Sequence, residues 1–221
     1  MSAATILTLA NGRGIDLLHP KASDVDFDSY AEQLTKEKRF NGATPGVEYS
    51  VGEHLSRGID AIMQATKDPV LAGYFSVHDG PEAVLKDDTT PKKHAIAEIC
   101  QQEFGILAEQ VLASMKKLED RHDVVIHAAA GLQWPMPQQL VTAVKRWDLI
   151  MFTTEWRDLM GNRPHPNPVP YAGIEPLRDV IVPWRWETAK TALLNRWRAL
   201  LPALRTLAHD KTRSEHGGAS V

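Results

Sequence analysis

The sequence predicts a helical fold that carries a small β-hairpin at its N-terminus. Apolar residues recur at helical spacing in most segments, which places them on one face of each predicted helix. Two short apolar runs, Thr5–Leu9 and Ile15–Leu18, flank an Asn-Gly pair typical of a hairpin turn, and we expect them to form a flap over residues 1–20. With 221 residues, 43% of them hydrophobic, the chain can bury one sizeable core. We therefore expect a single domain over residues 1–208 and a disordered tail over residues 209–221.

The composition argues against several classes of function. The net charge is −3 with mixed signs, so the chain lacks the basic patch that binding to a phosphate backbone needs, and nucleic acid is not an expected partner. The single cysteine, Cys100, offers neither an intramolecular disulfide nor a thiolate cluster for zinc. The sequence shows no charged leader and no apolar stretch of about 18 residues or more, so we expect a cytoplasmic protein without a membrane partner.

Helical stripes and breaking residues divide the rest of the chain. The predicted helices cover Phe27–Lys38, residues 49–66, a central segment from Asp68, one or two helices over Ala95–Leu118, Pro137–Met160 and Glu187–Leu201. The apolar segment Val124–Ala130 fits either a strand or a short helix. The Pro-rich segment Asn162–Pro170 cannot be a regular helix. Residues 175–208 are expected to form a C-terminal helical extension.

Three of these helices place a possible metal ligand on an otherwise apolar stripe. The central stripe comprises Val70, Leu71, Tyr74, Phe75 and His78. His78 is followed by Asp79, while His54 and Asp148 occupy similar positions in two other helices. A buried imidazole without a partner costs about 1–3 kcal/mol, so these side chains either find hydrogen-bond partners in the core or share a metal ion. Imidazole nitrogen combined with carboxylate oxygen suits Mn, Fe, Co, Ni or Zn better than calcium.

The same residues carry a resemblance to a known family. The order of His54, the pair His78-Asp79 and then Asp148 resembles the metal signature of the HD-domain phosphohydrolase superfamily. The stretches RFNG, YSVGEH, HDGPEAVLKDDTTPKK and WDLIMFTTEWRDLM resemble bacterial and phage members related to 5'-deoxynucleotidases and deoxynucleoside triphosphate hydrolases, including dATP-directed ones. The resemblance implies an all-α HD-domain helical bundle that hydrolyses phosphoric esters or anhydrides of deoxynucleotides.

The resemblance also implies roles for individual residues. The four ligand candidates would hold one divalent ion per site, namely Co, Mn, Zn or Mg. Glu82 matches the acidic residue that orients or deprotonates the attacking water, and Asp87 matches a second acid near the substrate. Arg39 matches an arginine that contacts the phosphate or sugar.

Several neighbouring residues bear on substrate binding. Lys93, together with Arg39, can supply the positive charge that a phosphate attracts. Phe40 can stack on the base or sugar of the substrate, or it can pack against the protein. The chain departs from the family at Lys86, where glycine is usual, and at the pair 88–89, where an apolar residue and then proline are usual. The loop that shapes the pocket is therefore expected to differ.

Two further groups of side chains have alternative interpretations. Glu155 and Asp158 are candidate ligands, but a salt bridge near the site, to Arg39 or Arg157, is the favoured interpretation. A second metal site could draw on three other histidines, although their spacing does not reproduce the two-metal pattern of the superfamily. They are His94, His122 and His127.

The leading hypothesis is therefore a metal-dependent deoxynucleotide phosphohydrolase. The sequence leaves open whether it removes phosphate from a monophosphate or triphosphate from a deoxynucleoside triphosphate. The alternatives are hydrolysis of guanosine tetraphosphate or cyclic nucleotides, and a catalytically idle scaffold that binds nucleotide or a protein partner. A homo-oligomer is also expected, with the Trp-bearing C-terminal helix and the N-terminal hairpin as the surfaces for self-association.

Overall fold

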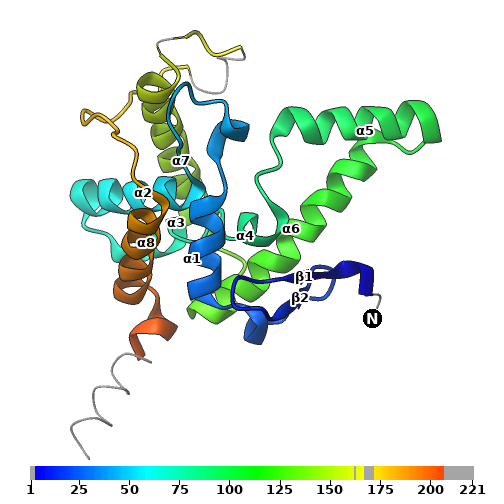
Figure 1. The fold of residues 1–221 in the computed structure, drawn as a ribbon, viewed down its shortest axis with the longest axis horizontal. Helices are drawn as coiled ribbons and strands as arrows, with labels where there is room; N and C mark the ends of the chain where they lie inside the picture. The colour runs from blue at the N-terminus through cyan, green and yellow to red at the C-terminus, as the bar shows by residue number, and fades with distance from the viewer. Residues whose placement is uncertain (1–2, 162, 167–171, 207–221) are drawn as a thin grey trace, which may run out of the picture.

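The computed structural model describes residues 3–161, 163–166 and 172–206. Over these residues the chain is mostly helical, with one two-stranded antiparallel sheet near the N-terminus (Figure 1). In chain order the strands and α-helices are β1 (Ile6–Thr8), β2 (Gly14–Asp16), α1 (Phe27–Lys36), α2 (Val51–Thr66), α3 (Pro69–Phe75), α4 (Glu82–Leu85), α5 (Thr90–Phe104), α6 (Ala108–Ala130), α7 (Gln138–Leu159) and α8 (Trp186–Leu200).

The predicted hairpin is confirmed, with strands shorter than the sequence suggested. Ile6 of β1 lies opposite Asp16 of β2, and Thr8 lies opposite Gly14. Gly12, in the turn, has a φ of +81°, a conformation that glycine adopts without the steric cost of a side chain.

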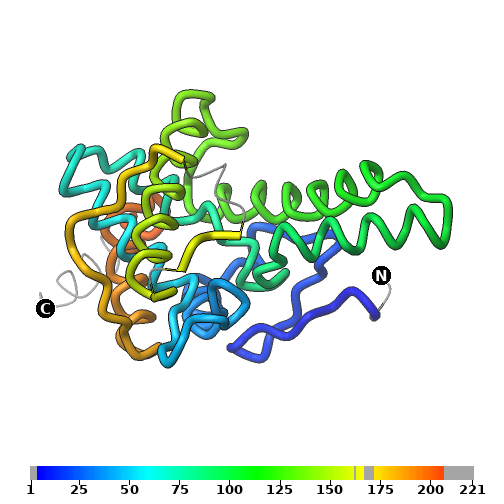
Figure 2. Tube along the Cα trace, turned by 90° about the horizontal axis from the view of Figure 1, so that it is seen from above, coloured from blue at the N-terminus to red at the C-terminus, as the bar shows by residue number. Residues whose placement is uncertain are grey.

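The helices form a body and an arm. Helices α1, α2, α3, α7 and α8 gather in the body, while α5 and α6 pack against each other and project from it (Figures 1 and 2). The β-hairpin lies alongside the arm, on the side of α6 away from α7 (Figure 1). The arm leaves the body directly after α4, so its base lies close to the segment that contains His78 and Asp79.

The hydrophobic core lies between the helices of the body and includes Trp197 of α8, which is 1% exposed. The Trp197 ring meets Phe27 of α1 edge-on, with centroids 5.1 Å apart. Its indole N–H donates to the backbone carbonyl of Ser76 at 2.9 Å. A buried indole needs such a partner, and this one fixes α8 to the backbone only two residues before His78.

Local sequence signals explain where the helices that precede the site begin. Helix α2 begins after Ser50, whose hydroxyl oxygen accepts the N–H of Glu53 at 3.1 Å. Helix α3 begins after Asp68, whose carboxylate accepts two N–H groups of the first turn, and Pro69 takes the first helical position. These caps fix the starting points of the segments that bring His54 and His78 into the core.

The helical stripe of the central segment is shorter than predicted. Helix α3 ends at Phe75, and Val70 is 55% exposed rather than buried. The next residues form tighter turns, in which the N–H groups of Val77 and His78 bond to carbonyls three residues back. His78 therefore lies in a turn after the helix, and its side chain direction is set by that turn.

The structure decides two segments that the sequence treated as helical or undecided. Val124–Ala130 forms the last turns of α6, so the helix alternative is confirmed and the strand alternative is wrong. Its apolar character reflects contact with the core, since Ile126 is 1% exposed. The predicted helix Glu187–Leu201 is confirmed as α8, while residues 175–185 before it are not helical. Pro176 and Pro183 lie in this segment, and neither can donate the backbone hydrogen bond that a helix interior needs.

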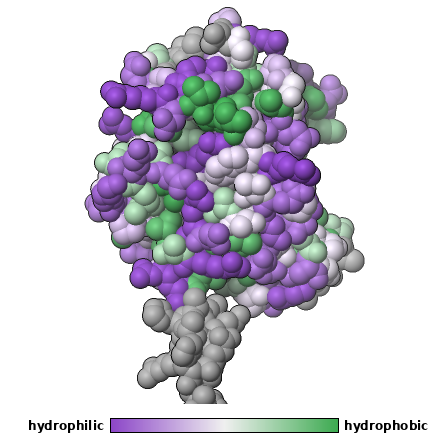
Figure 3. Space-filling view, turned by 60° about the vertical axis from the view of Figure 1, so that its left-hand side comes forward, coloured by the Kyte–Doolittle hydropathy of each residue, from purple (hydrophilic) through white to green (hydrophobic). Residues whose placement is uncertain are grey.

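The remaining predictions concern the Pro-rich loop, the C-terminal tail, membrane-spanning segments and self-association. The loop Asn162–Pro170 lies largely, and the tail 209–221 wholly, outside the described residues. Among the described residues, no helix combines the length and the apolar character needed to cross a bilayer. The face shown in Figure 3 is covered mainly by hydrophilic side chains, with hydrophobic ones in small separate groups. Self-association through α8 and the hairpin stays a prediction.

Candidate metal centre

The structure brings the four predicted metal ligands together from three parts of the chain. His54 comes from α2, His78 and Asp79 from the turns after α3, and Asp148 from α7. The Nε2 atom of His54 lies 3.6 Å from a carboxylate oxygen of Asp79 and 3.7 Å from one of Asp148. The Nε2 atom of His78 lies 3.1 Å and 3.9 Å from oxygens of the same two residues.

The two imidazoles are oriented in the same way toward this point. The Nδ1 atom of His54 lies 2.6 Å from the carboxylate of Glu155, and that of His78 lies 2.7 Å from the backbone carbonyl of Phe75. The acceptors hold a proton on each Nδ1 atom, so in the neutral form of each ring the Nε2 atom carries a lone pair. Both Nε2 atoms are buried and have no hydrogen-bond partner. Two buried nitrogens that face carboxylates fit a divalent cation, since ligand atoms of His54, His78 and Asp148 all lie within 4.8 Å of one another. Asp79 lies beside this group without belonging to it.

Glu155 is fully buried and joins three side chains around the site. Besides His54, it accepts a hydrogen bond from the hydroxyl of Tyr49 at 3.0 Å and one from the Nε of Arg39 at 2.9 Å. The predicted salt bridge between Glu155 and Arg39 is therefore confirmed. Asp158 pairs with Arg157 at 2.6 Å, as predicted. Sequence reasoning missed Tyr49, which it took as the first residue of the helix over residues 49–66 and which the structure places just before α2.

Arg39 has more ion-pair partners than the sequence suggested. Its guanidinium lies 3.4 Å from Asp79 and 4.0 Å from Asp148, in addition to its bond with Glu155. Burial by itself would lower the pKa of Arg39, but these carboxylates outweigh it and raise that pKa above its usual value. Arg39 is thus a fixed positive charge behind the ligands, and contact with a substrate stays a prediction.

The charges at the site also shift the pKa values of His78 and Asp148. Burial by itself would lower the pKa of His78, but Asp79 and Asp148 raise it to about 9. Burial opposes ionisation of Asp148, whereas His78 and the neighbouring cations hold its pKa well below the usual value. In a protein without bound metal, a proton on His78 therefore occupies the position that suits a cation.

A cavity of about 300 Å³ opens beside His78 and Asp79. Glu82 lines it from the first turn of α4, and one of its carboxylate oxygens is buried without a hydrogen-bond partner. Burial, followed by the negative charges of Asp79 and Asp87, raises the pKa of Glu82 well above its usual value. Glu82 thus has the position and the proton affinity expected of a group that exchanges protons with a bound ligand.

The other predicted site residues lie around this centre with different partners. Lys93 lines the cavity and pairs with Glu119 of α6 at 2.5 Å. Asp87 is partly buried, and burial raises its pKa although Arg39 opposes the shift. The ring of Phe40 packs against Phe152 and Trp156. Stacking of Phe40 on a substrate stays a prediction, and packing accounts for these two contacts.

The loop that shapes the cavity contains an unusual backbone conformation at Lys86. Its φ is +73° and its ψ is 163°, a region that side chains rarely adopt and glycine adopts readily. Because this residue directly follows α4, its conformation turns the chain from the end of that helix toward Asp88 and the start of α5. The Lys86 side chain pairs with Glu37 at 3.1 Å.

The three histidines considered for a second metal site do not join this cluster. Among the described residues, the potential ligand atoms that converge within 4.8 Å of one another belong to His54, His78 and Asp148. The ring of His122 donates to the carbonyl of Leu17 at 2.9 Å, and that of His127 bonds to the carbonyl of Asp123 at 2.8 Å. His94 is exposed.

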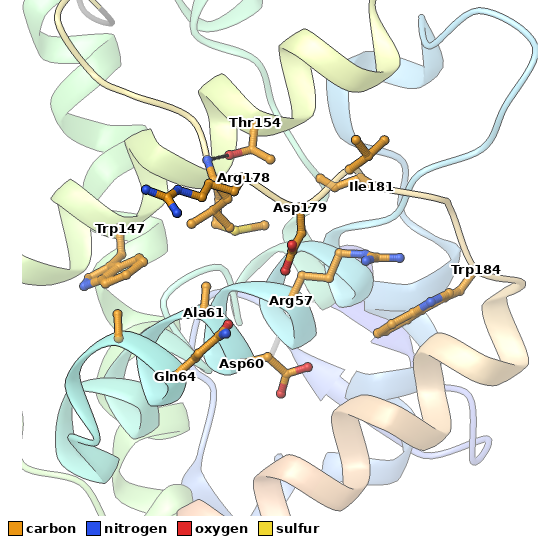
Figure 4. A pocket seen from close by; sticks show the side chains of 14 residues that line it. Arg57, Asp60, Ala61, Gln64, Trp147, Thr154, Arg178, Asp179, Ile181 and Trp184 are labelled. Carbon is orange, nitrogen blue, oxygen red and sulfur yellow. Dashed lines mark hydrogen bonds between the residues drawn. The ribbon is translucent and has the colours of Figure 1, made fainter.

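A larger cavity, of about 410 Å³, lies between α2, α7 and residues 177–184 (Figure 4). Its lining includes none of the four ligand candidates. Its charged residues are partly engaged already, because Arg57 lies over the ring of Trp184 and Asp60 pairs with Arg196. The chemistry described above therefore belongs to the smaller cavity.

Comparisons with known proteins link the chain to a bacterial relative. No family model matches the chain. An uncharacterized protein of Rhodobacter capsulatus is 29% identical over 158 residues, which cover 69% of this chain and 72% of the relative. The similarity therefore extends over most of both chains, and the relative's description names no activity.

Proposed function

We propose that the chain is a metal-dependent HD-domain phosphohydrolase that acts on deoxynucleotides. The observation that carries this proposal is the pair of buried Nε2 atoms on His54 and His78, which have no hydrogen-bond partner and face the carboxylates of Asp79 and Asp148. The order of these residues along the chain also resembles the metal signature of the superfamily. Burial of two unpaired imidazole nitrogens would be costly without a ligand that uses them.

The four candidate ligands fit a transition-metal ion better than calcium. Two imidazole nitrogens and two carboxylates form a mixed donor set that suits Mn, Fe, Co or Zn. When bound, such an ion supplies a Lewis acid that polarises a phosphoryl oxygen and makes a water molecule more acidic. Glu155 and the carbonyl of Phe75 keep the two imidazoles in the tautomer that coordination needs.

Glu82 is the candidate general base for hydrolysis of a phosphate ester. The oxygen of a water molecule forms a bond to phosphorus as the ester P–O bond breaks, and the Glu82 carboxylate accepts a proton from that water. Glu82 then gives this proton to the leaving oxygen, so the products are the alcohol and phosphate and the carboxylate is restored. The raised pKa of Glu82 supports this role, because a base is most effective when its pKa lies near the working pH.

The cavity also offers a place for the organic part of the substrate. Four apolar side chains line it beside the carboxylates, namely Pro81, Leu85, Met115 and Leu118. A sugar and base placed against them would leave the phosphate near His78 and Asp79. This arrangement supports an ester with an apolar or aromatic group, such as a deoxynucleotide.

The proposal is tested by removing all metal with a chelator, restoring Mn, Co, Zn or Mg, and measuring product release. The substrates are deoxynucleoside mono- and triphosphates, guanosine tetraphosphate and cyclic nucleotides. We expect metal-dependent hydrolysis of deoxynucleotides. Glu82→Gln should lower kcat by about 100-fold or more without changing metal affinity, because it removes the base and not a ligand.

The matched control is Glu103→Gln, at the exposed end of α5, which should leave kcat unchanged. If no nucleotide is hydrolysed with any of the metals, the proposed activity is wrong. Nucleotide binding without hydrolysis would instead identify an idle scaffold. Hydrolysis of guanosine tetraphosphate or cyclic nucleotides alone would identify the second alternative.

A further inference from the structure

The cavity beside the metal ligands is lined by more acidic residues than lysines. Five carboxylate residues and three lysines line it. The carboxylates are Asp79, Glu82, Asp88, Glu119 and Asp123, and the lysines are Lys86, Lys93 and Lys116. Each further phosphate group of a substrate would therefore add negative charge to a site that has no surplus of lysines.

None of the three lysines is without a carboxylate partner. The ion pairs are Lys86 with Glu37 at 3.1 Å, Lys93 with Glu119 at 2.5 Å and Lys116 with Asp120 at 2.7 Å. A lysine held by a carboxylate attracts a phosphate less strongly than a lone one, since the approaching anion also meets the carboxylate. These lysines therefore do not form the cluster of open cations that a chain of phosphates needs.

The arginine next to the site is occupied in the same way. Arg39 is 12% exposed and bonds to Glu155 while it lies close to Asp79 and Asp148. Its guanidinium would have to leave these carboxylates before it could bind a second or third phosphate, and buried carboxylates without a partner are costly.

The size of the cavity also favours a substrate with a short phosphate group. Its volume of about 300 Å³ lies at the lower end of the range of roughly 300–1,000 Å³ that ligand pockets span. The apolar wall of Pro81, Leu85, Met115 and Leu118 takes up part of this lining, which leaves a short polar end at His78 and Asp79.

From this charge balance we infer that the site selects substrates with a single phosphate group, namely nucleoside monophosphates, over the corresponding triphosphates. The inference rests on the proposed function and decides between the two reactions that the sequence left open. The products would be a nucleoside and inorganic phosphate. The carboxylates at Glu119 and Asp123 exclude longer phosphate chains by repulsion and by neutralising the lysines that would bind them.

Hydrolysis and binding together test the inference. With metal restored to the full chain, kcat/KM for a deoxynucleoside monophosphate should exceed that for the triphosphate of the same base by about tenfold or more. Release of triphosphate with an equal or higher kcat/KM would overturn the inference and leave the phosphohydrolase proposal intact. Calorimetry on metal-loaded Glu82→Gln protein gives an independent result, because it compares the affinities of the two nucleotides even if neither is hydrolysed. Tighter binding of the triphosphate there would also overturn the inference.

A charge substitution on α6 tests the cause of the selection. Glu119→Gln removes the partner of Lys93, so the affinity for the triphosphate should rise roughly two- to fivefold relative to the monophosphate. Glu109→Gln, the same change on the exposed first turn of α6, should leave the ratio of affinities unchanged. If both variants leave the ratio at its wild-type value, the ion pairs do not set the preference.

Discussion

The Nδ1 atom of His54 and the carboxylate of Glu155 lie 2.6 Å apart, and neither side chain is exposed to solvent. The two residues are 101 positions apart in the chain and come from α2 and α7. This contact fixes the orientation of the imidazole, so that its Nε2 atom faces Asp79 and Asp148. Glu155 therefore positions a ligand candidate and is not itself among the atoms that converge.

Glu155→Gln should weaken metal binding by about 10- to 100-fold, because the carboxylate that orients His54 is lost. Calorimetric titration with Mn, Co or Zn measures this change. Glu103→Gln on α5 serves as the control and should bind metal as the wild type does. Unchanged affinity in Glu155→Gln protein would show that the contact has no influence on the metal centre.

Metal removal should lower the stability of the protein. At a free metal concentration of about 100 times Kd, binding adds about 2.7 kcal/mol to the free energy of unfolding. His78→Ala should abolish this gain because it removes one of the converging nitrogens, whereas His94→Ala should keep it, since His94 is exposed and outside the cluster. The Tm of the His78→Ala and His94→Ala variants, measured with and without chelator, tests both expectations. A metal-dependent rise in Tm of His78→Ala protein equal to that of the wild type would contradict the ligand assignment.

Gly58→Ala should destabilise the protein by about 1–3 kcal/mol, as overpacked core substitutions do. A Cβ atom at Gly58 would lie 2.2 Å from a ring carbon of Phe75, and this buried ring also packs against His78 with centroids 4.6 Å apart. The control is Gly73→Ala in α3. A Cβ atom added there would have no other atom within 4 Å, and helix propensity favours alanine by about 1 kcal/mol. In urea, the free energy of unfolding should be lower than that of the wild type for Gly58→Ala and higher for Gly73→Ala. Equal changes in the two variants would contradict the predicted clash.

Lys86→Gly should stabilise the protein by about 1 kcal/mol. The φ of +73° at Lys86 is strained for a residue with a side chain, and relief of that strain outweighs loss of its half-exposed ion pair with Glu37. Lys92→Gly, in helix α5, should instead lose about 1 kcal/mol because glycine is a poor helix former. Urea unfolding measures both changes. Destabilisation of Lys86→Gly protein would show that the ion pair matters more than the strain.

Stability of the metal-free protein should depend on Asp123. Burial raises the pKa of Asp123 from 3.8 to about 7, so between these values the folded state holds a proton that the unfolded state has lost. The free energy of unfolding contributed by this group therefore falls as pH rises through that range. Asp123→Asn should be more stable than the wild type at pH 8, with a smaller difference at pH 5, when chelator-treated samples are unfolded in urea. Asp179→Asn, on an exposed segment, is the control, and an equal difference at both pH values would contradict the prediction.

Local sequence patterns were enough to predict most of the elements and several of the side chains that meet at the candidate site. The Asn-Gly turn predicted the hairpin, and helical stripes predicted most of the helices, because turn preference and amphipathic spacing act over a few residues. The placement of His54, His78 and Asp148 on separate segments indicated a shared site, and the structure brings them together.

The orientation of those side chains, and the pairing of the charges around them, became visible only in the folded chain. The fold places Glu155 behind His54, pairs Lys93 with Glu119 and surrounds Phe40 with other rings. It also ends α3 before His78. Each of these outcomes depends on packing between segments far apart in the chain, where small differences in helix position choose one partner over another, and a local sequence pattern carries no information about that choice.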